Sequence, residues 1–194
     1  MLARPRGMRL AKRAGYMRST ALVVLAACTT GIDAAAPPPD AAAPAPDARS
    51  MDAVDLQMIR EARRVGAFQR VDRAPYLSSV AGATIDVFIS QDARDYRRIH
   101  PETTGSAVTM PPGTLIVRQV LDAQGQVTKV TLMAKQRAGY DPTLGDWWFG
   151  VTDPAGQPLS DASGPQVGRL TECHGCHLPR AQDDYLFGVP KTDQ

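Results

Sequence analysis

Near the C-terminus, five residues with the order Cys173-His174-Gly175-Cys176-His177 combine two thiols with imidazoles. Two cysteines separated by two residues can each attack a vinyl group of haem and form a thioether, and the histidine that follows is then placed below the iron. The motif therefore predicts one covalently bound haem c, attached through Cys173 and Cys176, with His177 as the proximal ligand of the iron.

Three other chemistries use the same residue types. A zinc site needs four well-placed ligands. Besides Cys173, Cys176 and His177, only His174 and the distant His100 remain to complete it. A thioredoxin-like redox pair lies at the start of a helix in a βαβ unit, which this sequence lacks. A disulfide between Cys173 and Cys176 suits an oxidising compartment but leaves the adjacent histidine unexplained. Haem attachment is the preferred interpretation.

The sixth coordination position of the iron separates the functions open to such a protein. His174 is expected in a solvent-facing loop, pointing away from the iron. A strong sixth ligand implies electron transfer, whereas an open or weakly occupied position implies small-molecule binding or redox catalysis. The candidate sixth ligands are His100, Met51, Met58, Met110 and Met133.

The N-terminus carries the pattern of an export signal. Six basic residues and no acidic residue precede a short apolar run at 21–27, which is too short to cross a bilayer as a helix. Leu25-Ala26-Ala27-Cys28 is similar to the lipobox of bacterial lipoproteins, in which the cysteine carries the lipid. Residues 1–28 are therefore predicted to be a lipoprotein signal peptide with Cys28 as the lipidated residue; the alternative is a plain secretory signal cut nearby.

Residues 29–50 are predicted to be a disordered linker rich in Ala, Pro and Asp, because they show no apolar periodicity and offer little surface to bury. Its prolines favour an extended chain of roughly 3 Å per residue, long enough to hold a domain away from a membrane. Together with the lipid, the linker predicts a haem domain, residues 51–194, on the periplasmic side of a bacterial outer membrane. Without the lipid, the protein is expected free in the periplasm.

The charge of the chain gives no indication of a nucleic-acid partner. Hydrophobic residues make up 43% and charged residues 22% of the chain, as in ordinary soluble globular proteins. The formal charge of +2 comes from the N-terminal segment, and its removal takes six basic residues away and leaves −4. The mature protein is mildly acidic, which argues against nucleic-acid binding.

The haem motif needs a folded frame, whose first predicted element is a helix. Ser50 is the expected N-cap, Asp52 and Asp55 lie in the first turn, and Gly66 is the expected end. One helical face is apolar and is expected in the core, which makes its methionines packing residues rather than iron ligands. That face consists of Met51, Val54, Met58, Ile59, Ala62 and Val65.

After the helix the apolar period becomes that of strands. The predicted strands are 84–90, 114–121, 127–135 and 146–152. A Pro-Pro-Gly turn at 111–113 leads into the second strand, and the Gly-containing loop 122–126 joins the second and third strands as an antiparallel hairpin. The predicted fold class is mainly β (α+β): a meander-like antiparallel sheet with a helix before it and a haem-binding segment after it.

Side chains alternate between the two faces of a strand, which assigns several residues to sides. Trp147 and Phe149 share one side of the last strand and Trp148 takes the other, so that one side packs on haem or core. Lys129 and Lys135 share a side of strand 127–135, which is interpreted as a solvated face.

The order of these motifs resembles the cytochrome P-460 family over roughly residues 66–190. The matching segments are Pro111–Arg118, Val130–Lys135, Gly139–Pro142, Gly145–Phe149, Cys173–His177 and Asp184–Phe187. The resemblance implies a mainly antiparallel β domain with one c-type haem, a proximal His177 and a distal side free of a strong protein ligand. Members of the family oxidise hydroxylamine or bind nitric oxide, and dimers are common among them.

In the enzymes of this family a lysine is also cross-linked to the haem ring, ahead of the Pro-Gly turn. This sequence has no lysine between Gly82 and Pro112. The basic residues there are Arg94, Arg97, Arg98 and His100. The candidate carboxylates for a distal proton relay are Glu172, Asp146 and Glu102.

Three functions follow as expectations. The first is a lipid-anchored haem protein of the cytochrome P-460 type that binds nitric oxide or hydroxylamine, or acts on one as an oxidoreductase, with a periplasmic redox partner and a homodimeric state as further expectations. The second is a single-haem periplasmic electron-transfer cytochrome with a methionine or His100 as sixth ligand. The third is a non-catalytic sensor or binding domain.

Overall fold

The computed structural model describes residues 49–194. The predicted signal peptide 1–28, the lipidation site Cys28 and all of the linker 29–50 except its last two residues lie outside the described residues. Within 49–194, no helix is long and apolar enough to cross a membrane.

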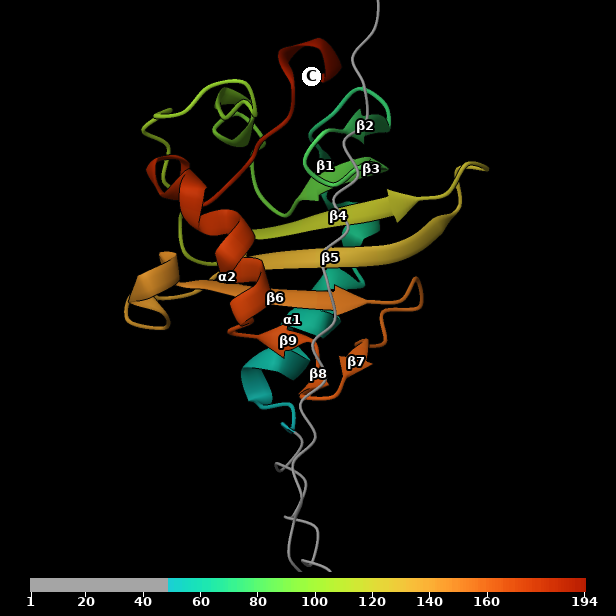
Figure 1. Cartoon of the computed structure of the whole chain (residues 1–194), viewed down its shortest axis with the longest axis vertical. Helices are drawn as coiled ribbons and strands as arrows, with labels where there is room; N and C mark the ends of the chain where they lie inside the picture. Colours follow the sequence, from blue (N-terminus) through green and yellow to red (C-terminus); the bar gives the residue numbers. More distant parts are fainter. Residues whose placement is uncertain (1–48) are drawn as a thin grey trace, which may run out of the picture. The chain divides into compact units, whose positions relative to one another are not determined.

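Figure 1 shows a twisted sheet with one helix behind it and a second helix across its front. The α-helices are α1 (Ala53–Ala62) and α2 (Thr171–His177). Short 3-10 segments occupy Val65–Ala67, Tyr96–Arg98, Pro142–Leu144, Leu178–Asp183 and Lys191–Asp193. The strands are β1 (Gln69–Arg70), β2 (Tyr76–Ser78), β3 (Ala83–Ile89), β4 (Leu115–Leu121), β5 (Val127–Lys135), β6 (Trp147–Thr152), β7 (Ser160–Asp161), β8 (Gly164–Pro165) and β9 (Val167–Gly168).

The main sheet has the order β1-β3-β4-β5-β6-β9, with β2 also paired to β3 and every pairing antiparallel. Its centre is the predicted meander, β3 to β6, in which each strand pairs with the next along the chain. The four predicted strands agree with the observed ones to within one residue at each end, which confirms the predicted fold class. The remaining strands have two or three residues each, too short to show a period in the sequence.

The alternation of side chains divides the core into two clusters, one on each face of the sheet. On one face α1 packs against a cluster that includes Leu115, Val117, Leu132 and Trp148. On the other face, which carries α2 in Figure 1, the cluster consists of Val71, Tyr76, Ile85, Val87, Ile89, Ala93, Tyr96, Ile99, Val108, Met110, Ile116, Leu144, Trp147, Phe149, Leu186 and Val189. Trp147 and Trp148 are both fully buried, on opposite faces, as the alternation predicts.

Helix α1 begins two residues later than the apolar pattern suggested. Its N-cap is Asp52 rather than Ser50, because the Asp52 carboxylate accepts from the Asp55 N–H at 2.9 Å while Asp55 reaches back to the Asp52 N–H at 3.0 Å. The regular helix ends at Ala62, and Gly66 lies in the following 3-10 turn. The predicted apolar face packs on the sheet except at its first member, Met51, which is exposed.

Asp55 joins this helix to the sheet. Its carboxylate is 1% exposed, accepts a 2.7 Å hydrogen bond from the indole N–H of Trp148, and forms an ion pair with Arg49 at 3.0 Å. A carboxylate with these partners satisfies a buried indole donor that the apolar core could not satisfy. Asp55 therefore lies in the first turn of α1, as predicted, and also holds this helix against the sheet.

We expect Asp55→Ala to lower the free energy of unfolding by about 2–4 kcal/mol, because Trp148 loses its acceptor and the helix loses half of its capping box. Urea denaturation followed by far-ultraviolet circular dichroism measures this. Leu56→Ala, at an exposed position of the same helix, is the control and should stay within about 0.5 kcal/mol of the wild type. Equal stabilities of the two variants would contradict the role assigned to Asp55.

Candidate functional site

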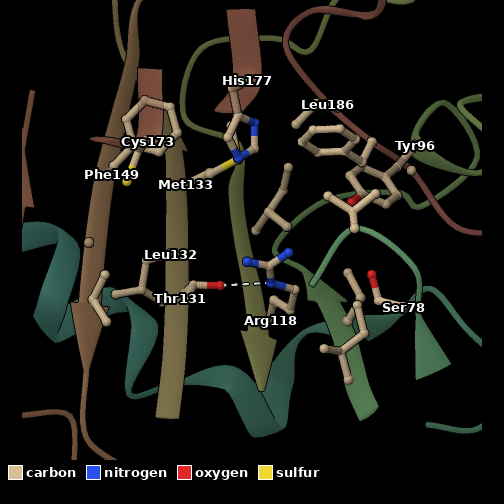
Figure 2. Close-up of a pocket in the computed structure, with 18 of the residues that line it drawn as sticks. Ser78, Tyr96, Arg118, Thr131, Leu132, Met133, Phe149, Cys173, His177 and Leu186 are labelled. Atoms are coloured by element: carbon tan, nitrogen blue, oxygen red, sulfur yellow. Dashed lines mark hydrogen bonds between the residues drawn. The ribbon is translucent and has the colours of Figure 1, made fainter. Parts of the chain in front are cut away.

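A pocket lies between the sheet face that carries α2 and the C-terminal segment after it (Figure 2). The space between its walls amounts to about 690 Å³, including the part that is open to solvent. Strands β2 to β6 supply one wall, and α2 with the segment around Leu186 supplies the other. The apolar lining includes Ile85, Val87, Ile116, Met133, Phe149, Val151, Leu186 and Phe187.

Helix α2 spans the predicted haem motif, from Thr171 to His177. In a helix, positions three and four residues apart lie on the same face, so Cys173 is the neighbour of both Cys176 and His177. Cys173 and His177 both line the pocket, and Cys176 is exposed beside them. The structure thus brings one thiol and the imidazole of the motif into the same cavity.

His177 is held in one orientation by three neighbours. Its ring lies 5.4 Å from that of Phe149 and 5.1 Å from that of Phe187, centroid to centroid. Its Nδ1 lies 2.6 Å from the backbone oxygen of Tyr185. Because a carbonyl can only accept, Nδ1 carries the proton and donates, which leaves the Nε2 lone pair free to bind a metal. Figure 2 shows this ring directed into the pocket.

The surroundings of His177 also keep it neutral. Burial lowers its pKa below the ordinary value of 6.5, and the positive charge of Arg118 adds to this, against the opposing effect of the Tyr185 hydrogen bond. At neutral pH the imidazole is therefore in the form that coordinates metals.

The carbonyl that accepts from His177 is presented by an unusual turn. Asp184 and Tyr185 have φ values of 53° and 64°, which residues other than glycine rarely adopt. Such residues cost about 1–3 kcal/mol each and persist where the surrounding structure fixes them. The turn reverses the chain after the 3-10 segment Leu178–Asp183 and points the Tyr185 oxygen back at α2.

The arrangement of these residues differs from what a zinc site, a disulfide or a thioredoxin-like pair would need. Among residues 49–194, no three His, Cys, Asp or Glu side chains gather in a way that could hold a metal ion. Cys173 and Cys176 are free rather than joined as a disulfide. The sheet is antiparallel, so α2 is not the helix of a βαβ unit. Burial, with smaller contributions from Glu172 and Cys176, raises the pKa of Cys173 to about 11 and keeps its thiol protonated.

The pocket also contains a cation that the sequence reasoning missed. Arg118, on β4, is half-buried among the apolar lining, and its Nε donates to Thr131 Oγ1 at 2.9 Å. Within the described part of the chain it has no ion-pair partner. Figure 2 shows His177 and Arg118 entering the pocket from opposite sides. An arginine at the centre of the apolar face Ile116–Val120 is the sequence signal that could have identified it.

The structure places the candidate sixth ligands in different parts of the fold. Met133 lines the pocket, and none of the other candidates does. His100 packs beside the C-terminal segment, with Nδ1 3.3 Å from the Val189 oxygen. Met110 is buried in the core, Met58 accepts from Gln136 on the α1 side, and Met51 is exposed.

His174 is not in a solvent-facing loop as expected. It lies within α2 and is half-buried, with its Nε2 enclosed and without a hydrogen-bond partner among residues 49–194. The motif is helical here, so His174, three residues before His177, lies on a neighbouring position of α2 rather than in a loop.

The other polar candidates lie outside the pocket. Glu102 and Glu172 are exposed, and Asp146 accepts from the Asp141 N–H in the turn before β6. Arg94 and Arg98 are exposed, and Arg97 donates to the backbone oxygens of Val71 and Arg70. No lysine and no carboxylate lines the pocket in the part of the chain that the structure describes.

The predicted solvated face of β5 holds for Lys129, which is exposed, and is wrong for Lys135. Lys135 is buried, because its ammonium group pairs with Asp184 at 2.5 Å and lies 5.0 Å from the centre of the Trp147 ring. A lysine is buried when such a partner offsets the loss of hydration.

A protein-family model matches part of the chain. Residues 103–188 match the family model described as cytochrome P-460, which confirms the family predicted from the motif order and implies a haem cofactor. The match contains β4, β5, β6 and α2, and therefore Arg118, Cys173 and His177, and leaves out α1 and β1 to β3. No curated protein matches the chain.

Proposed function

Since residues 103–188 belong to the cytochrome P-460 family, we propose that this protein holds one haem c, attached through Cys173 and Cys176 with His177 as axial ligand, and binds a small nitrogen oxide. The observation that carries the proposal is the position of His177. Its ring lies in the family's matched segment and enters the same pocket as Cys173, with Nδ1 hydrogen-bonded at 2.6 Å and Nε2 left free.

The attachment residues suit their proposed roles. The i, i+3 and i+4 spacing along α2 puts both thiols and the imidazole on neighbouring positions. Cys173 reaches the cavity and Cys176 remains exposed, where it is open to reaction with the edge of a porphyrin. Phe149 and Phe187 pack against the His177 ring and keep water from its flanks.

A haem in this pocket would supply an iron atom able to take up a small ligand and to exchange single electrons. The lining of the pocket favours a ligand that accepts hydrogen bonds, because its charged group is the guanidinium of Arg118. A guanidinium without a carboxylate partner has donors to spare, and hydrogen bonds from charged donors are the stronger ones. Nitric oxide and hydroxylamine both carry an oxygen that can accept them.

The protonation states of the lining favour ligand binding and electron exchange over hydroxylamine oxidation. Oxidation of hydroxylamine releases protons, and no carboxylate lines the pocket among residues 49–194 to receive them. Burial raises the pKa of Tyr96 to about 12, so that this phenol also stays protonated. Nitric oxide binding needs no proton acceptor and is the preferred activity.

Electron transfer remains the second candidate, and the position of Met133 favours it. This is the candidate methionine whose side chain lines the pocket. A thioether sulfur as sixth ligand would make the iron a closed, low-spin electron carrier.

For the location, we propose a lipoprotein anchored through Cys28 on the periplasmic side of a bacterial membrane. The support comes from the lipobox-like sequence and the proline-rich linker after it. A periplasmic electron donor or acceptor and a homodimeric state belong to the same proposal, by analogy with the family.

We expect the purified full-length protein to keep its haem on a denaturing gel and to show a high-spin optical spectrum that shifts when nitric oxide is added. Cys173→Ala with Cys176→Ala should lose the covalent haem, because no thioether can form. A wild-type protein without covalent haem would overturn the proposal. Sharp α and β bands in the reduced wild type, lost in Met133→Leu, would establish the electron carrier instead.

We expect Arg118→Leu to raise the dissociation rate of nitric oxide at least about tenfold, since a hydrogen bond from a charged donor contributes about 1.5–3 kcal/mol. Stopped-flow spectroscopy measures the rate, and the pyridine haemochrome assay checks that haem content is unchanged. Thr131→Val, which removes only the hydrogen bond that orients Arg118, should give a smaller increase. An unchanged rate in Arg118→Leu would exclude its contact with the ligand.

We expect Cys28→Ser to move the protein from the membrane fraction to the soluble periplasmic fraction of the expressing bacterium, because serine at this position does not receive the lipid that anchors the protein. Fractionation and immunoblotting measure this. A wild-type protein already found in the soluble fraction would contradict the lipoprotein assignment and favour a plain secretory signal.

A further inference from the structure

Lys135 and Asp184 form a buried ion pair, and neither residue lines the pocket. The pair lies at the end of β5, with side-chain exposures of 9% and 7%, on the sheet face that carries Met133 and Thr131 towards the pocket. Charged pairs are expensive to bury, since both partners lose their hydration. A pair buried this deeply fixes the geometry of the chain around it.

Asp184 uses each of its acceptors to connect a different part of the fold. One carboxylate oxygen binds Lys135 at 2.5 Å, and the other accepts from the backbone N–H of Met110 at 2.8 Å. Its backbone oxygen accepts from the indole N–H of Trp147 at 2.8 Å. Three segments, namely β5, β6 and the chain before β4, therefore converge on this one residue.

Asp184 begins a turn whose next residue, Tyr185, is hydrogen-bonded to His177. Asp184 and Tyr185 are two successive left-handed residues, and the second presents its carbonyl to His177 Nδ1 at 2.6 Å. The Tyr185 ring packs over Gly145, where a Cβ atom would lie 2.6 Å from its Cε2. Two such strained residues in a row persist because their surroundings hold them, and the ion pair with Lys135 is one of the contacts that hold Asp184.

We propose that Lys135 and Asp184 are positioning residues for the axial ligand: their ion pair fixes the Tyr185 carbonyl against His177 Nδ1 and thereby sets the reduction potential of the iron. The proposal rests on the haem ligation proposed above. A firm hydrogen bond at Nδ1 makes Nε2 a stronger donor to the metal, which stabilises the oxidised iron and lowers the potential. Loosening the turn weakens this bond and raises the potential.

The opposite face of the sheet offers a matched control. Asp55 is also buried, also pairs with a basic residue, Arg49, and also accepts from a buried tryptophan, Trp148. It packs under α1 rather than beside His177. A purely structural effect of losing a buried carboxylate should be the same at both positions, whereas an effect on the axial ligand should appear at Asp184 alone.

The test compares Asp184→Asn, Lys135→Met and Asp55→Asn in the haem-bearing full-length protein. Asparagine tolerates the left-handed conformation, so Asp184→Asn removes the charge with little other change. The reduction potential is measured by redox titration, the Fe(II)–His stretching frequency by resonance Raman spectroscopy, and stability by urea denaturation. If the single variants fail to fold, Lys135→Gln with Asp184→Asn removes both charges together and keeps a hydrogen bond.

We expect the Asp184 and Lys135 variants to have a higher potential and a lower Fe–His frequency. At a fixed poise the ratio of reduced to oxidised iron should rise up to about tenfold, equivalent to 59 mV for one electron. Asp55→Asn should be destabilised with both quantities unchanged. Haem-bearing Lys135 and Asp184 variants with wild-type potential and frequency would overturn this proposal alone, whereas a wild-type protein without haem would overturn it together with the proposed ligation.

Discussion

Alternation of side chains along a sheet that is covered on both faces is the constraint on which the rest of this structure depends. Each central strand must supply one set of residues to the α1 face and another to the α2 face. On the α1 side the cover is a regular amphipathic helix. On the α2 side it is a short helix and an irregular C-terminal segment, and the pocket lies between these and the sheet.

The two adjacent tryptophans show how the same problem is solved on both faces. Trp148 and Trp147 are fully buried and each carries one indole donor that needs an acceptor. Trp148 donates to the carboxylate of Asp55, and Trp147 donates to the backbone oxygen of Asp184. Each of these aspartates in turn pairs with a basic side chain. On the first face this secures a helix, and on the second it secures the turn that orients His177.

The pocket combines two kinds of residue, which the proposed function uses on opposite sides of the cavity. Phe149 and Phe187 pack against the ring of His177, the proposed iron ligand. Arg118 and its partner Thr131 place a cation in the same cavity without a neutralising carboxylate. A metal ligand facing a hydrogen-bond donor across a largely apolar cavity is suited to holding a small polar molecule, because few other groups compete for it.

The sequence by itself determined the parts whose signals are local. The meander from β3 to β6 followed from strand periodicity and turn residues, and the family followed from the order of its motifs. The roles of Cys173, Cys176 and His177 follow from chemistry that needs only their spacing, and they stay predictions until haem is measured. Arg118 also had a local signal, because it is a charged residue on an otherwise apolar strand face. The strand period shows its position but not the function of its charge.

Tertiary structure decided what depends on residues far apart in the chain. Lys135 looked solvated on its strand and is buried, because Asp184, 49 positions later, neutralises it. The Asp52–Asp55 capping box is local, but its member Asp55 is also bound by Trp148, 93 positions later, and by Arg49. Met133, and not the other candidate methionines or His100, reached the pocket. Burial and long-range contacts set these outcomes, because a side chain's environment depends on segments that only the fold brings beside it.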